Sequence, residues 1–157
     1  QFRNFIPKGC TYFLAPFSIK KGSNIYGLIF GSNSSVGLEK FLEAAWENNK
    51  NTGEANFNID SDSIVDNPQL KIFPEDNVIK KYDVFKRNLL KWLKCGFRSN
   101  KEIRIFTIAN GMLVKHANGI LREEFSNLSI RSTDEIKKGS FYLGVRSRKK
   151  IWVKKNE

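Results

Sequence analysis

The sequence predicts an α+β fold in two parts, and three observations lead to this expectation. Two apolar runs joined by a turn open the chain, segments with helical spacing follow, and positive charge is concentrated in the second half. Residues 1–79 contain seven Lys and Arg against nine Asp and Glu, whereas residues 80–157 contain twenty against seven. We therefore divide the chain into a nearly neutral part, residues 1–74, and a strongly basic part, residues 75–157.

The first part is predicted to form a β-hairpin followed by a helix. Residues 11–19 and 25–30 are apolar runs separated by a five-residue turn that contains glycine, a pattern typical of a hairpin. Because proline cannot donate a ladder hydrogen bond, Pro16 favours an edge or bulged strand. The Ser-rich residues 32–35 can cap a helix over residues 37–48. The apolar stripe of that helix is Leu38, Phe41, Leu42 and Ala45.

Residues 49–74 are predicted to be a linker, because Asn, Asp, Ser and Gly dominate the composition there. A short strand is expected at residues 55–59. Three carboxylates of the linker, Asp60, Asp62 and Asp66, lack the Gly and the bidentate Glu that a calcium loop needs. We expect a solvated acidic loop and no metal.

The basic part is predicted to contain three helices. The first begins near Glu75, whose carboxylate suits the positive end of a helix, and ends at Gly96. The other two span residues 99–109 and 114–125, and the Asn110-Gly111 pair separates them. Two helices joined by so short a turn are typical of a helix-turn-helix. The apolar side of the last helix is Val114, Ala117, Ile120, Leu121 and Phe125.

Strands are expected to follow these helices. Residues 128–131 and 140–145 are predicted to pair around a polar loop, and residues 151–153 are predicted to add a last strand. The order helix, helix, turn, helix, hairpin is that of a winged helix-turn-helix domain.

The basic part indicates a nucleic-acid partner, because Lys and Arg that neutralise phosphates release condensed counterions. Lys115, Asn118 and Arg122 share one face of the last helix, and Asn and Arg are suited to reading adenine and guanine. Two alternatives remain open: a basic surface that serves solubility, or a surface that docks a protein. The residues expected to contact double-stranded DNA are Lys115, His116, Asn118 and Arg122 on the last helix, Arg98, Lys101 and Arg104 around the preceding helix, and Arg131, Lys137, Lys138, Arg146, Arg148, Lys149 and Lys150 in the wing. RNA is not distinguished from DNA by these residues.

No stretch of the chain predicts catalysis or a cofactor. His116 is the single histidine, which excludes His-pair metal sites and leaves one residue to carry any Ser-His-Asp triad. Two alternatives remain for His116: contact with DNA, or capping and packing at the start of its helix. Residues 31–37 have five residues between two glycines and no Lys-Ser or Lys-Thr after them, unlike a phosphate-binding loop.

The cysteines and the apolar runs bear on the cellular environment. Cys10 and Cys95 are far apart and follow no ligand spacing, so both are expected to be small buried thiols in a reducing cytoplasm. No apolar run approaches the roughly 18–20 residues that span a bilayer, so no membrane partner is expected. Gln1 in place of an initiator Met favours a fragment of a longer protein.

Two motifs resemble segments of the three-Cys-motif partner proteins. Residues 25–33 with 37–46 are similar to a signature late in that family, and residues 105–121 with 138–143 are similar to the segments that follow it. The resemblance covers most of residues 11–145. It implies that the hairpin and helix complete the Rossmann-like sheet of a methyltransferase-like α/β body, and that a winged helix follows. The glycine-rich motifs of the family's first half have no counterpart here, and a Ser-Ser pair replaces a His-Pro, so the resemblance implies the C-terminal half alone.

Together these features predict a DNA-binding module that targets a larger or partner protein through a basic winged helix. Two other classes remain open. One is a protein-interaction module, and the other is the non-catalytic part of a methyltransferase-like enzyme, which would bind S-adenosylmethionine only through its first half.

Overall fold

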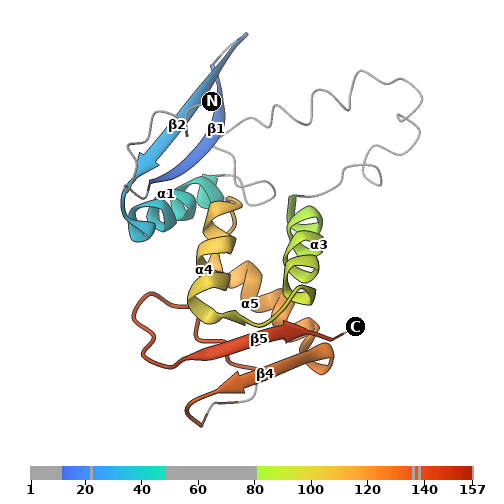
Figure 1. The fold of residues 1–157 in the computed structure, drawn as a ribbon. Helices are drawn as coiled ribbons and strands as arrows, with labels where there is room; N and C mark the ends of the chain where they lie inside the picture. The colour runs from blue at the N-terminus through green and yellow to red at the C-terminus, as the bar shows by residue number, and fades with distance from the viewer. Residues whose placement is uncertain (1–11, 22, 49–80, 136, 138, 157) are drawn as a thin grey trace, which may run out of the picture. The chain divides into compact units, whose positions relative to one another are not determined.

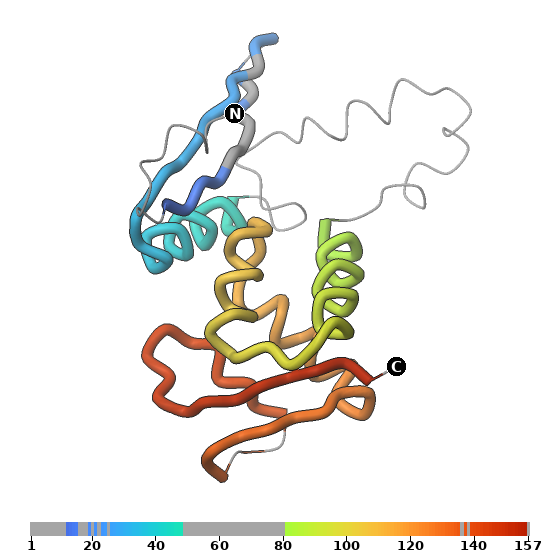
Figure 2. Tube along the Cα trace, in the orientation of Figure 1, coloured from blue at the N-terminus to red at the C-terminus, as the bar shows by residue number. Residues whose placement is uncertain are grey.

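The computed structural model describes residues 12–21, 23–48, 81–135, 137 and 139–156 (Figures 1 and 2). Helices and strands are mixed in these residues, so the fold is α+β as predicted. The chain divides into two compact units, residues 1–81 and 82–157, and each is described by itself. The expected linker, its short strand and the start of the first basic helix lie outside the described residues.

The first unit contains a β-hairpin of β1 (Phe13–Lys21) and β2 (Asn24–Ser32). The antiparallel register runs without a break from Phe13 opposite Ser32 to Lys21 opposite Asn24. Two residues therefore join the strands, and the expected five-residue turn is wrong. Pro16 lies opposite Ile29 within this register, so the strand has no bulge there.

Helix α1 (Ser35–Asn48) follows the hairpin and begins two residues earlier than expected. Its start is set by Ser34, whose Oγ accepts a hydrogen bond from the Val36 backbone N–H at 3.2 Å. Phe41 stacks on Phe30 of β2 with ring centroids 4.3 Å apart, which joins the helix to the hairpin. The buried residues of α1 are Leu38, Leu42, Ala45 and Trp46.

The second unit contains three α-helices, close to their predicted bounds. They are α3 (Lys81–Lys94), α4 (Asn100–Ala109) and α5 (Val114–Glu123). Gly96 follows α3 with φ of 152°, a conformation that side chains disfavour, and this confirms it as the stop of that helix. Helix α5 ends two residues earlier than expected, and a short 3-10 helix, Phe125–Asn127, follows it.

A three-stranded antiparallel sheet completes the second unit. Strands β3 (Arg98–Ser99) and β4 (Leu128–Ser132) flank β5 (Ile151–Lys155), so the order is β3-β5-β4. Figure 1 shows β4 and β5 side by side, with the three helices on one side of the sheet. Strand β3 was not expected from the sequence, because two residues are too few to show alternation.

The expected strand at residues 140–145 is wrong, since the partner of β4 is β5. Residues 140–145 have no regular structure, and Tyr142 has a left-handed φ of 48°. Phe141 and Leu143 are nevertheless buried. An irregular segment therefore inserts these two side chains into the core without pairing as a strand.

The core of the second unit is made by side chains from every helix and from the sheet. All of the following are less than one-tenth exposed: Phe85, Leu89, Leu93, Ile103, Ile108, Met112, Ala117, Ile120, Leu121, Phe141, Leu143, Ile151 and Val153. A core of this kind stabilises the unit through loss of apolar surface from water.

The buried side chain of Asn100 fixes the segment between β4 and β5. Its Nδ2 donates hydrogen bonds to the backbone carbonyls of Tyr142, at 2.9 Å, and Lys149, at 3.0 Å. Asn100 is only 4% exposed, so its buried amide is satisfied by these two bonds and holds both carbonyls in place. One amide at the start of α4 therefore shapes a long irregular connection.

We predict that Asn100→Ala lowers the free energy of unfolding by about 2 kcal/mol, because buried acceptors lose their donor. Chemical denaturation followed by circular dichroism measures the change. Asn88→Ala, an exposed position of α3, is the matched control and should shift stability by less than about 0.5 kcal/mol. Equal stability of the two variants would contradict the role given to Asn100.

Candidate nucleic-acid interface

Helices α4 and α5 are joined by a tight, fully hydrogen-bonded turn. The N–H of Gly111 donates to the Ile108 carbonyl at 3.0 Å, and the N–H of Met112 donates to the Thr107 carbonyl at 3.1 Å. Gly111 has φ of 70°, and this pair of bonds is the Schellman motif that ends many helices. The turn predicted from Asn110 and Gly111 is therefore confirmed, and it fixes where α5 begins.

Helix α5 has one buried side and one polar side. Ala117, Ile120 and Leu121 are fully buried, as the apolar spacing predicted. Lys115 and Arg122 are exposed on the other side, and Asn118 between them is half-buried. The spacing of three and four residues places these polar side chains on one face.

Arg122 also connects α5 to the segment between β4 and β5. Its Nε donates a hydrogen bond to the Gly139 carbonyl at 3.2 Å. A guanidinium has five N–H donors, so the contact orients the side chain and leaves donors for a ligand. No local pattern signals this contact, because 17 residues separate its partners.

His116 caps the start of α5. Its Nδ1 accepts a hydrogen bond from the Leu113 backbone N–H at 3.2 Å. Its ring meets the Tyr82 ring edge-on, with the two ring centroids 6.0 Å apart. Burial raises the pKa of Tyr82, with a smaller contribution from Glu123. These contacts support the alternative in which His116 caps and packs at the start of its helix. A contact between His116 and DNA stays a prediction.

The arginines around α4 are less accessible than expected. Arg104 is only 6% exposed, because it lies on the same side of the helix as Ile103 and Thr107. Little of the Arg104 side chain is therefore available to a phosphate, and its contact with DNA stays a prediction. Arg98 is half-buried, with its guanidinium carbon 4.7 Å from the centroid of the Trp92 ring. Lys101 alone of the three is exposed.

The segment between β4 and β5 carries several exposed positive charges. Lys149 is half-buried. Its Nζ donates a hydrogen bond to the Glu135 carbonyl and lies 5.2 Å from the centroid of the Tyr142 ring. The Lys137 backbone N–H donates to the Tyr142 hydroxyl at 3.4 Å and lowers the pKa of that tyrosine. Lys138 lies outside the described residues. The exposed cations of this segment and of β4 are Arg131, Lys137, Arg146, Arg148 and Lys150.

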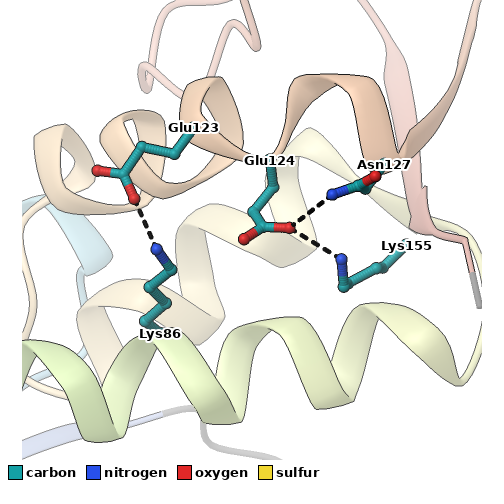
Figure 3. Close-up of polar contacts among 5 residues, drawn as sticks. All are labelled: Lys86, Glu123, Glu124, Asn127 and Lys155. Carbon is teal, nitrogen blue, oxygen red and sulfur yellow. Dashed lines mark hydrogen bonds and ion pairs between the residues drawn. The ribbon is translucent and has the colours of Figure 1, made fainter.

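The two carboxylates at the end of α5 are paired with cations of neighbouring elements (Figure 3). Lys86 Nζ lies 2.7 Å from Glu123, and Lys155 Nζ lies 2.9 Å from Glu124. The hydrogen bond to Glu123 raises the pKa of Lys86, and the bonds from Lys155 and Asn127 lower the pKa of Glu124. Because these acids are neutralised, Lys115 and Arg122 dominate the charge of α5.

Other kinds of site find little support in the described part of the chain. It holds no cluster of three His, Cys, Asp or Glu residues that could bind a metal, and none of its helices is long and apolar enough to cross a membrane. Cys95 is exposed and not buried as expected, because it follows the last buried turn of α3. Cys10 lies outside the described residues.

Comparison with known proteins adds no identification. No protein-family model matches the chain, and no curated protein or solved structure matches it either. The resemblance to the three-Cys-motif partner proteins therefore stays a prediction, and function is inferred from the site.

We predict that His116→Ala lowers the free energy of unfolding by about 1 kcal/mol, because the Leu113 N–H loses its acceptor. Thermal denaturation measures the loss. Lys115→Ala, the exposed neighbour, is the control and should change stability by less than about 0.5 kcal/mol. A His116→Ala variant as stable as the parent would show that the cap contributes nothing.

We also predict an acid-sensitive contribution from Glu124. Its pKa lies below the ordinary 4.5, so the ion pair stabilises the fold above that value and is lost as the pH falls through the lowered pKa. Glu124→Gln should cost about 1 kcal/mol near neutral pH and progressively less as the pH falls through the lowered pKa of Glu124. Denaturation from acid to neutral pH measures the difference. Glu135→Gln, which removes an exposed charge, should show no such trend, and a Glu124→Gln effect that ignores pH would contradict the pairing.

Proposed function

We propose that residues 82–157 form a winged helix-turn-helix domain that binds double-stranded DNA. Three features support the fold: the element order α3-β3-α4-α5-β4-β5, the antiparallel order β3-β5-β4, and the tight turn between α4 and α5. In such a domain the second helix of the motif lies in the major groove. Helix α5 is that helix here.

The observation that carries the proposal is the polar face of α5. Lys115 and Arg122 are exposed there on a helix whose opposite side is anchored in the core. The major groove admits an α-helix, and an arginine can pair with guanine while an asparagine pairs with adenine. We assign base contacts to Asn118 and Arg122 and a phosphate contact to Lys115.

The segment between β4 and β5 acts as the wing in this proposal. Its exposed cations have no ion-pair partner among the described residues, so their charge is available to phosphates. The hydrogen bond from Arg122 to Gly139 holds this segment to α5. The phosphate contacts are Lys101, Lys137, Arg146, Arg148 and Lys150, together with Lys138 and Lys149.

The first unit supports a role within a larger assembly. Tyr26, Leu28 and Ile29 of β2 are each more than 40% exposed, and they lie on both faces of a two-stranded hairpin. An isolated hairpin of this kind is marginally stable in water. We propose that it joins the α/β body of a larger cytoplasmic protein, such as the methyltransferase-like body of the three-Cys-motif partner proteins, which the DNA-binding domain then targets.

We predict that Lys115→Ala with Arg122→Ala lowers affinity for random-sequence duplex DNA at least about tenfold, because two groove-facing cations are lost. Fluorescence anisotropy at low and high salt measures it, and parent binding should weaken steeply with salt. Lys91→Ala with Lys94→Ala removes the same charge from exposed positions of α3 and should change affinity less than about threefold.

Two results would contradict the proposal. The first is parent affinity that is equal at low and high salt. The second is an equal loss in both double variants, which would assign binding to net charge and not to α5. Co-purification of a protein partner that survives nuclease treatment, without duplex binding, would favour the protein-interaction alternative.

A further inference from the structure

The outward face of the β3-β5-β4 sheet is a second surface with its own chemistry. Ile151 and Val153 of β5 are fully buried, so they face the helices. Side chains alternate along a strand, and Trp152 and Lys154 therefore point away from the helices. Both are half-buried. Sequence reasoning missed this face, although the alternation of Ile151 to Lys154 signals it.

The flanking strands place a cation and a second aromatic ring on this outward face. Arg131 of β4 lies opposite Trp152 in the register and is exposed. Its guanidinium carbon lies 3.9 Å from the centroid of the Phe97 ring, which directly precedes β3 on the other side of β5. The guanidinium therefore reaches across the central strand, and the aromatic rings and the cations form one surface.

Small or polar residues fill the remaining outward positions. Ser99 lies opposite Trp152, and Ser129 lies opposite Lys154. Ser99 is turned to the start of α4, where its Oγ and the Glu102 carboxylate hydrogen-bond at 2.7 Å. No residue of the three described strands is acidic, and the Glu102 carboxylate beside Ser99 is engaged by the cap of α4.

We propose that this face, defined by Phe97, Arg131, Trp152 and Lys154, binds single-stranded nucleic acid. Unpaired bases stack on aromatic rings and on arginine planes, and cations beside them bind the backbone phosphates. Charge complementarity selects this ligand, because two cations of the strands lie beside the rings and the strands carry no acid. The half-buried Trp152 ring can stack on an unpaired base, whereas bases within a duplex already stack on one another.

This site is separate from the proposed duplex site. Helix α5 packs on the buried side of the sheet, whereas Trp152 points away from it. The inference does not depend on duplex binding, and variants on one surface leave the other intact.

The test uses the full 157-residue chain with labelled 12-nucleotide oligo-dT and oligo-U, followed by fluorescence anisotropy. Binding of either oligonucleotide supports the proposal, and their ratio distinguishes DNA from RNA. Trp152→Leu and Arg131→Ala should each weaken binding at least about fivefold, which is the loss expected for one stacked base. Duplex affinity of Trp152→Leu should stay within about twofold of the parent, because Trp152 is not among the proposed duplex contacts.

Three control variants match these changes. Tyr26→Leu removes an exposed aromatic ring from the first unit, and Lys91→Ala removes one exposed charge from α3; both should bind the oligonucleotides as the parent does. Lys115→Ala with Arg122→Ala should lower duplex affinity alone, so failure of either proposal is separately visible. Circular dichroism confirms folding, and if Trp152→Leu does not fold, the exposed Arg131→Ala decides.

Three results would overturn the proposal. In the first result, the parent binds neither oligonucleotide. In the second result, Arg131→Ala and a folded Trp152→Leu bind the oligonucleotides as tightly as the parent does. In the third result, the α5 double variant loses single-strand affinity as much as Trp152→Leu, which would place both ligands on one surface.

Discussion

The amide of Asn100 is the interaction on which the shape of the second unit depends. A connection of 18 residues between β4 and β5 has few regular hydrogen bonds of its own, yet it places Phe141 and Leu143 in the core. Asn100 Nδ2 donates hydrogen bonds to the backbone carbonyls of Tyr142 and Lys149, which lie at the two ends of residues 142–149. With residues 142–149 held in this way, β5 enters the sheet between β3 and β4, and Arg122 of α5 bonds the Gly139 carbonyl of the same connection.

Charge in this unit is sorted by position. The carboxylates of Glu123 and Glu124 meet Lys86 and Lys155 from neighbouring elements, and Glu102 closes the cap of α4, where hydrogen bonds from Ser99 lower its pKa. The remaining cations are therefore little opposed locally. A small domain can in this way present two positive surfaces: the polar face of a helix that fits a groove, and the face of a sheet that offers rings to unpaired bases.

Local signals predicted the helices well, because each depends on neighbours in the chain. Three correct predictions depend on residues within about five positions of one another. They are the Asn110-Gly111 turn, the stop at Gly96 and the apolar side of α5. The errors have non-local causes. Residues 140–145 were expected to form a strand, but they are an irregular segment that places two side chains in the core, and Arg104 was expected to contact phosphate but is covered by the packing of its unit.

The sequence by itself determined the α+β class, the bounds of α1, α4 and α5 to within two residues and the concentration of positive charge after residue 80, since composition and short-range spacing are properties of the chain. Only the tertiary structure decided which strand pairs with β4, which arginines reach solvent and which side chains share the outward face of the sheet. Those outcomes depend on contacts between residues dozens of positions apart, and a pattern of neighbouring letters does not record them.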